Sequence, residues 1–287
     1  MLMQGTEELR EARAAGRALA AFSVYNMETT QAVVAAAERT GLPVLIQAGS
    51  SAFAHAGREP LAWIALEAAT AATVPIGVHL DHCRDLEEID ACLKLGYTSV
   101  MFDGSKLPFE ENVAQTRAAA KRAHAAGAWV EGELGGVPGD EDTSEAAAAA
   151  AMTDPDEAAA FVAATGIDAL AVAVGNVHGL AAGVTHIDLD RLGEIAAKVG
   201  PVPLVLHGAS GVDRDVLRAA AAAGVVKFNV NTELRRAFFD ALDRDLAADR
   251  DGYALARLLD AARADVADVA AEIAELLAGR TAAKGAR

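Results

Sequence analysis

Eight short apolar runs, separated by longer alanine-rich stretches, constrain the fold of this chain more than any other feature. Their hydrophobicity is continuous rather than alternating, as in parallel strands that are buried on both faces. Many of the stretches between them end at a glycine such as Gly41, Gly96 or Gly166, a residue that stops a helix just before the next strand. This repeat of strand, helix and glycine predicts a (β/α)8 barrel, the TIM barrel. The eight runs span residues 18–26, 43–49, 75–82, 98–104, 128–135, 168–175, 202–210 and 224–231.

The rest of the chain fits one such barrel with extra helices. Its 287 residues are an ordinary length for this fold, so we expect residues 1–287 to form a single domain. Apolar spacing in about 233–279 predicts two or three further helices, a C-terminal extension that could make contacts in an oligomer. A doubly wound open sheet is the alternative, but no Gly-x-Gly-x-x-Gly turn follows the first run. Helices between the strands are predicted over 29–39, 62–72, 86–95, 113–126, 155–164, 189–198 and 213–223.

Charge and cysteine usage bound the partners and the compartment. The formal net charge is −16, from 25 basic and 41 acidic residues, which argues against nucleic acid and anionic membranes as partners. No apolar run reaches the length of a membrane span, and the charged N-terminus lacks the apolar core of a signal peptide. Cys83 and Cys92 are the only cysteines, and two reduced thiols are typical of a cytoplasmic protein. We therefore expect a soluble, cytoplasmic protein.

Three histidines follow three of the predicted strands. His82 ends the third run, His178 follows the sixth, and His207 lies in the seventh. The carboxyl ends of barrel strands meet at one face, where the active sites of this fold lie. Three imidazoles with an open fourth position form a catalytic zinc site. The alternative is three unrelated histidines at strand-to-loop junctions.

Other polar residues occupy the same strand ends, and burying them costs free energy unless they are paired or bind something. A metal with a polyhydroxylated or phosphorylated substrate accounts for more of them than a purely structural network does. The segment 208–211 (GASG) precedes a predicted helix. Its small residues let the backbone approach a ligand, and the N–H groups at the start of a helix favour an anion. The polar set comprises Asp81, Asp103, Ser105, Glu131, Glu133, Asn176, Ser210, Asn229, Asn231 and Thr232.

An ordered set of motifs resembles a known family, the class II, zinc-dependent ketose-bisphosphate aldolases of the fructose- and tagatose-1,6-bisphosphate type. The motifs are HLDH (79–82), MFDGSKLPFEEN (101–112), VEGELG (130–135), GNVHG (175–179), HGASG (207–211) and FNVNTELR (228–235). The similarity covers nearly the whole chain and is closest to the shorter, tagatose-type branch.

The resemblance implies a metal-dependent mechanism. His82, His178 and His207 would bind one zinc, which would polarise the ketone of dihydroxyacetone phosphate. Asp81 would exchange the proton of the C4 hydroxyl, and Glu141, on the loop after the fifth strand, would handle the proton on the nucleophilic carbon.

Further positions carry over as metal and substrate contacts. Asp103 and Glu133 match a second, alternative metal position, and carbonyls near His178 and His207 would hold a monovalent cation, Na⁺ or K⁺. A homodimer or homotetramer is the family expectation. The substrate contacts implied are Gly179, Gly208, Ala209, Ser210, Asn229, Val230, Asn231 and Thr232.

Two departures from the family pattern leave the substrate open. Ala181 and Ala182 lie where relatives carry an aromatic residue and a phosphate-binding lysine, so binding of a second phosphate is not fixed. Pro138 and Gly139 replace a usual Gly-Gly, which leaves the loop base open among the acids at 140–142.

Other functions compete with this interpretation. An aldolase that forms a Schiff base needs a buried lysine, and only Lys227 lies within a predicted strand. A zinc barrel of another reaction class, such as a hydrolase or epimerase, would use Asp81 as the base of a bound water. A binding protein for sugar phosphates that lost activity is the third alternative. Within the aldolases, a deoxy-ketoacid or sulfonated sugar phosphate substrate also fits.

Overall fold

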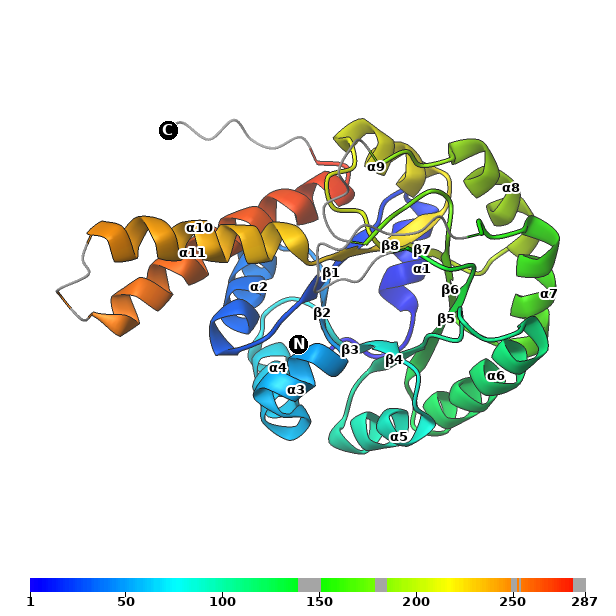
Figure 1. Ribbon diagram of the computed structural model, residues 1–287, viewed down its shortest axis with the longest axis horizontal. Coiled ribbons are helices and arrows are strands. Elements are labelled where there is room, and N and C mark those ends of the chain that lie inside the picture. Colours follow the sequence, from blue (N-terminus) through cyan, green and yellow to red (C-terminus); the bar gives the residue numbers. More distant parts are fainter. Residues whose placement is uncertain (139–150, 179–184, 249–251, 253, 281–287) are drawn as a thin grey trace.

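Eight parallel strands close into a barrel in which the strands follow one another in chain order and β1 pairs with β8. The computed structural model describes residues 1–138, 151–178, 185–248, 252 and 254–280 (Figure 1). Each strand coincides with one of the eight apolar runs, so the predicted TIM barrel is confirmed. The strands are β1 (Leu19–Ser23), β2 (Val44–Ala48), β3 (Ile76–Cys83), β4 (Ser99–Phe102), β5 (Trp129–Leu134), β6 (Ala169–Val172), β7 (Leu204–Leu206) and β8 (Val225–Val230).

Helices surround the barrel, and capping residues set where several of them begin and end. Asn26 caps the first of the surrounding helices by accepting from the backbone N–H of Thr29, so this helix begins two residues before the predicted start. Gly41 and Gly96 end two of the helices in the left-handed conformation, as predicted. The helices up to β8 are α1 (Glu7–Ala14), α2 (Met27–Thr40), α3 (Ser50–Ala56), α4 (Arg58–Ala71), α5 (Leu86–Leu95), α6 (Phe109–Ala125), α7 (Pro155–Thr165), α8 (Leu189–Val199) and α9 (Arg214–Ala222).

The barrel interior changes from apolar to polar along the strands. At the amino ends, Leu19, Leu45 and Trp129 pack with Leu9 of α1, which closes that end of the barrel. Side chains alternate along a strand, so every second residue faces the interior. Towards the carboxyl ends of the strands these inward-facing residues are polar. These are buried, and they include Gln47, His79, Asp81, Glu131, Glu133, Lys227 and Asn229. The carboxyl half of the barrel is therefore a buried polar chamber.

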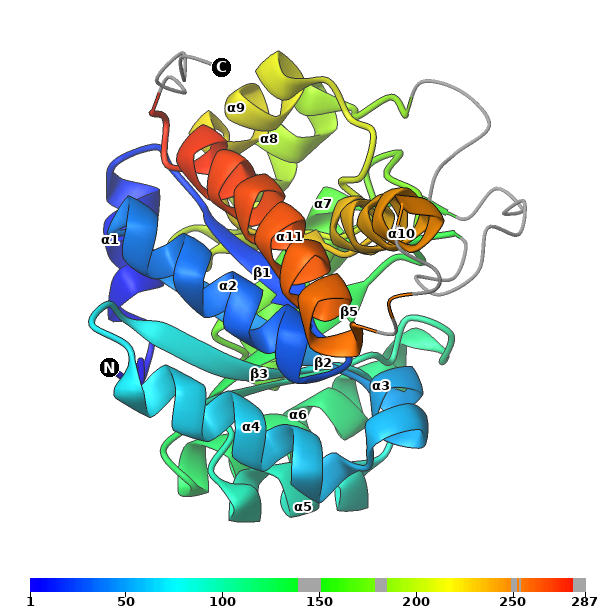
Figure 2. The ribbon, with the colours of Figure 1, turned by 90° about the vertical axis from the view of Figure 1, so that its left-hand side faces the viewer.

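Two long helices form the C-terminal extension. They are α10 (Thr232–Ala248) and α11 (Leu255–Leu277), within the range predicted for two or three helices. The pair extends sideways from the barrel (Figure 1), and α11 lies along α2 (Figure 2). Across the described part of the chain, no helix combines the length and apolarity that a membrane crossing requires.

Candidate active site and metal centre

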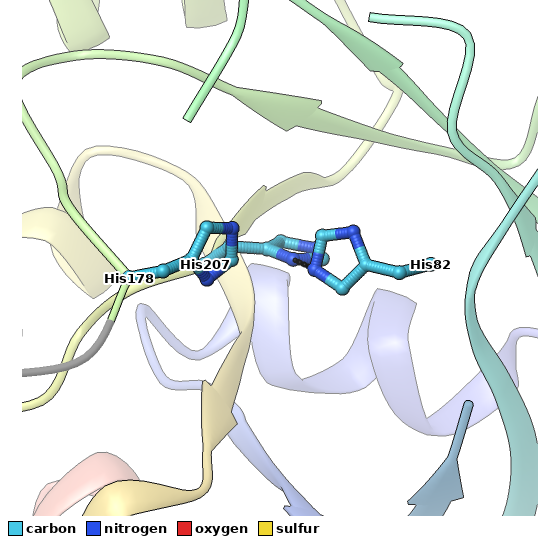
Figure 3. Close-up of side chains that lie close together, drawn as sticks. All are labelled: His82, His178 and His207. Atoms are coloured by element: carbon cyan, nitrogen blue, oxygen red, sulfur yellow. Dashed lines mark hydrogen bonds between the residues drawn. The ribbon is translucent and has the colours of Figure 1, made fainter. Parts of the chain in front are cut away.

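The three histidines predicted as metal ligands meet at the carboxyl end of the barrel. His82 is the second-last residue of β3, His178 follows β6 and His207 follows β7 (Figure 3). One ring nitrogen from each lies within 4.8 Å of the others. His178 and His207 are buried, and His82 is half-buried at the edge of the cavity. Three imidazoles from separate parts of the barrel thus converge as a donor set of the kind that binds a catalytic zinc ion.

The backbone has a positive φ at His82 and at Gly208, the residue after His207. His82 has a φ of 45°, the only positive φ of a non-glycine residue in the described chain. Such a conformation costs about 1–3 kcal/mol and persists only where surrounding structure enforces it. Gly208, with a φ of 60°, brings the segment after His207 against Val177, whose carbonyl oxygen would lie 2.3 Å from any Cβ at position 208. Close packing between the two loops therefore depends on glycine.

The protonation of His207 suits a metal ligand. Its Nε2 lies 2.7 Å from Glu131 Oε1, and an ionised carboxylate can only accept, so Nε2 carries the proton and Nδ1 keeps its lone pair. Burial, followed by the charge of His82, lowers the pKa of His207 to about 4 despite the opposing influence of Glu131. His207 Nδ1 faces His82 Nε2 at 2.8 Å (Figure 3). The imidazole is thus neutral at pH 7, the form that binds metals.

Asp81 is buried beside this triad and is held by two amides. Asn229 Nδ2 donates to Asp81 Oδ1 at 3.0 Å, and Gln47 Nε2 donates to Oδ2 at 2.9 Å. Gln47 also donates to Ser23 Oγ at 3.1 Å. The hydrogen bonds from Asn229 and Gln47 fix the plane of the Asp81 carboxylate.

A second donor cluster shares His82. His82 Nδ1 lies 3.7 Å from Asp103 Oδ2 and 3.8 Å from Glu133 Oε2. Burial alone would raise the pKa of Asp103, but the nearby His82, the hydrogen bond from Ser105 and the charge of Arg84 outweigh it and hold this pKa well below its usual range. Burial, and then the charge of Asp103, raise the pKa of Glu133 to about 8. Among the described residues, Glu133 Oε2 is buried without a hydrogen-bond partner, so this carboxylate has an oxygen that a cation would satisfy.

Comparison with known proteins identifies the family to which this barrel and its donor set belong. The family model of class II fructose-bisphosphate aldolases matches residues 3–281. The chain belongs to the class II fructose-bisphosphate aldolase family. It is 39% identical over 266 residues to the D-tagatose-1,6-bisphosphate aldolase subunit GatY of Klebsiella oxytoca, covering 92% of this chain and 93% of that protein.

Two further relatives support the same assignment. Sulfofructosephosphate aldolase of Alkalicoccus urumqiensis is 37% identical over 267 residues, 93% of each chain. The crystal structure of the YdjI aldolase from Escherichia coli K12 superposes with a TM-score of 0.86 at 34% identity, covering 96% of this chain and 97% of that one. The protein is therefore a lyase of the class II aldolase type, and its family acts on sugar phosphates. The histidine triad and the unsatisfied Glu133 oxygen fit the zinc on which this family generally depends.

The main cavity of the aldolase, of about 810 Å³, opens over the two donor clusters. It is lined by Asp81, His82, Arg84, Asp103, Glu133 and His178, among others. Arg84 reaches Asp103 Oδ2 with its Nε at 2.8 Å, and Ser105 Oγ donates to Asp103 Oδ1 at 2.6 Å.

Several positions expected to contact substrate line a second cavity, and one of them also reaches the barrel interior. Ala209, Ser210, Asn229 and Val230 line a smaller cavity of about 250 Å³ towards α11. Ser210 Oγ donates to Glu233 Oε2 at 2.6 Å, so this hydroxyl is engaged by a carboxylate of α10. Asn229 is the residue of this group that reaches the barrel interior and Asp81.

Three of the remaining expected substrate contacts can be located, and Gly179 cannot. Asn231 Nδ2 donates to Tyr25 Oη at 2.9 Å, and Thr232 is the first residue of α10. Gly208 forms the close approach to Val177. Glu141 and Gly179 lie outside the described residues, as do the other acids at 140–142 and the alanines at 181–182.

The structure adds residues that the sequence alone did not assign to the site. Gln47 holds Asp81, and Arg84 holds Asp103. In the sequence, Gln47 is marked only as a polar residue inside an apolar run. Arg84 is marked only as a cation close to a predicted metal ligand.

Lys227, the candidate for a Schiff base, has a different environment from the one that chemistry needs. Its Nζ donates to Glu131 Oε2 at 2.8 Å and to Asn229 Oδ1 at 2.7 Å. An amine that is ion-paired and hydrogen-bonded in this way is not presented to a substrate as a nucleophile. The contacts therefore do not favour the Schiff-base alternative.

Proposed function

We propose that this enzyme is a zinc-dependent aldolase that cleaves a ketose phosphate, or forms it by condensation, with dihydroxyacetone phosphate as one product. Glyceraldehyde 3-phosphate is the other product if the substrate is fructose- or tagatose-1,6-bisphosphate. The observation that carries the proposal is the convergence of three histidine nitrogens, within 4.8 Å of one another, beside a buried aspartate at the barrel mouth.

His82, His178 and His207 would hold one zinc per chain. Bound there, the metal supplies Lewis-acid polarisation of the ketone carbonyl. The proposal is supported by the neutral, Nε2-protonated state of His207, because it places the lone pair on Nδ1, the nitrogen that faces His82. Asp103 and Glu133 would offer the alternative metal position, which the unsatisfied Glu133 oxygen supports.

Asp81 would transfer the proton of the substrate C4 hydroxyl. In cleavage, the C3–C4 bond breaks, its electron pair stays with C3 of the dihydroxyacetone phosphate half, and the hydroxyl proton passes to the Asp81 carboxylate. In condensation, Asp81 returns that proton. Gln47 and Asn229 both donate to Asp81, so they orient the carboxylate. Glu141 would exchange the proton on C3; each such acid–base group contributes about 10²–10⁴ in rate.

The cavity and the relatives support a doubly anionic ketose phosphate as the substrate. Arg84 and Lys106 bring positive charge to the rim of the main cavity, and a substrate that carries an anion on its aldehyde half would face them. A ketose bisphosphate, as in the tagatose relative, and a sulfonated ketose phosphate, as in the sulfofructosephosphate relative, both meet this requirement. Gly179, Gly208 to Ser210 and Asn229 to Thr232 would contact the phosphate and the dihydroxyacetone portion.

The proposal includes the state of the working enzyme. We expect a single barrel domain with the helical extension, a homodimer or homotetramer in the cytoplasm, and a monovalent cation, Na⁺ or K⁺, at carbonyls near His178 and His207.

Release of dihydroxyacetone phosphate from a substrate panel tests the function. Fructose-1,6-bisphosphate, tagatose-1,6-bisphosphate, and the deoxy and sulfonated analogues are each incubated with enzyme, with enzyme plus chelator, and after zinc add-back. Zinc-dependent release from any of them supports the proposal, and the ranking identifies the aldehyde half. No release from any substrate, by protein shown to contain zinc, contradicts it and favours another zinc reaction or a binding role.

A further inference from the structure

Lys227 lies at the centre of the polar chamber, beneath the site. It is on β8, and its side chain is fully buried, as is that of Glu131. A buried ammonium is costly unless it is paired and hydrogen-bonded. Lys227 meets this condition with two acceptors that lead to different parts of the site: Glu131 Oε2 at 2.8 Å and Asn229 Oδ1 at 2.7 Å.

The contact with Glu131 leads to the metal ligand. Lys227 holds one oxygen of this carboxylate, and the other oxygen accepts from His207 Nε2 at 2.7 Å. This bond orients the imidazole ring and places its lone pair on Nδ1. Partners of this kind fix the tautomer and orientation of ligating histidines.

The contact with Asn229 leads to the proton-transfer carboxylate. An ammonium has donors but no acceptor, so the Asn229 oxygen must face Lys227 and its amino group must face the other way. That amino group donates to Asp81 Oδ1 at 3.0 Å and lies 3.1 Å from His207 Nδ1. With the amide flipped, an oxygen would face the Asp81 carboxylate, and the two would repel.

We infer that Lys227 is a positioning residue that couples the two halves of the site: through Glu131 it sets the metal-binding nitrogen of His207, and through Asn229 it orients Asp81. Lys227 does not line the main cavity and acts through its two partners. The inference rests on the proposed function for the role of Asp81, whereas the link from Lys227 to zinc affinity does not require catalysis.

The two links can be separated with two variants and a control. Lys227→Met removes the ammonium but keeps an apolar chain of similar length. Lys227→Met combined with Glu131→Gln also removes the unpaired buried charge, so it guards against a failure of the single variant to fold. Lys198→Met, which removes an exposed lysine paired with Asp156, controls for the loss of a positive charge.

Three measurements are made on each folded enzyme: zinc affinity by competition with a chromophoric chelator, uptake of solvent deuterium into dihydroxyacetone phosphate, and carbon–carbon cleavage at saturating zinc. Lys227→Met should weaken zinc binding by about 10–100-fold. The double variant should lose cleavage by about 10²-fold or more while keeping deuterium uptake, because that exchange does not use Asp81. The control should match the parent enzyme in all three.

Parental zinc affinity in Lys227→Met would overturn the link to His207. Parental cleavage by the folded double variant, or an equal loss of cleavage and deuterium uptake, would overturn the link to Asp81. A parent enzyme that releases no dihydroxyacetone phosphate from any substrate would refute the proposed function instead, and the zinc measurement would still test the first link.

Discussion

Gly208→Ala tests whether the close approach of two loops positions the metal ligands. Position 208 has a φ of 60°, and a Cβ there would lie 2.3 Å from the Val177 carbonyl oxygen and 3.0 Å from the backbone nitrogen of His178. Since ordinary van der Waals contact begins at 3.4 Å, the segment that carries His178 must move by about 1 Å. Displacement of a catalytic group by this amount can cost about 10²-fold in rate.

The chain offers a matched control for this variant. Gly166, at the end of α7, has a φ of 73° with nothing within 4 Å of its hypothetical Cβ. Gly166→Ala therefore carries only the strain of a left-handed residue, about 1–2 kcal/mol. Both variants are compared by urea unfolding, zinc content and kcat. Gly208→Ala should lose about 10²-fold in kcat, or a corresponding share of its zinc, whereas Gly166→Ala should lose stability alone. Equal kcat and zinc content in the two variants would refute the reasoning.

Three further predictions follow from the site and the core. Asp81→Ala should fold and keep zinc but lose carbon–carbon cleavage by about 10²–10⁴-fold; near-normal turnover in a steady-state assay would contradict the proton-transfer role. His207→Ala should bind zinc far below one equivalent per chain, since one of three ligands is gone; full retention by elemental analysis would break the triad. Burial raises the pKa of Cys83 to about 11, and that of Cys92 rises also, so both thiols should stay protonated at pH 8 and react with a disulfide reagent only after unfolding. Rapid reaction of the native enzyme would contradict their burial.

The barrel was predictable because its signal is repeated along the chain. Eight apolar runs predict eight strands that are buried on both faces. Because helices fill the intervals between them, a closed parallel barrel is the topology that fits. The helix α3 was not predicted, because its 7 residues are too few for helical periodicity to be recognised. The sequence of α1 indicated only a charged N-terminus. Its role in closing the barrel depends on Leu9 meeting side chains from distant strands.

The site was predictable to the extent that it lies at strand ends. The barrel topology brings His82, His178 and His207 together, and their positions after strands were visible in the sequence. The partners of residues inside strands were not, because they depend on register across the barrel. Gln47 and Lys227 acquire their roles only when the closed barrel brings them to Asp81, Glu131 and Asn229.

Ser210 shows a different limit of sequence reasoning. Its place in a Gly- and Ser-containing turn before a helix predicts an anion contact. In the structure the Ser210 hydroxyl donates instead to Glu233, the second residue of α10. A competing carboxylate from another helix cannot be recognised from the turn itself.

Titration of zinc into metal-free enzyme tests the central claim most directly. Dihydroxyacetone phosphate release from the best substrate of the panel is followed as zinc is added. If His82, His178 and His207 form the catalytic centre, activity should be absent at the start, rise in proportion to zinc and reach a plateau at one equivalent per chain. Full activity in the metal-free enzyme, or bound zinc without any activity, would contradict a zinc-dependent aldolase.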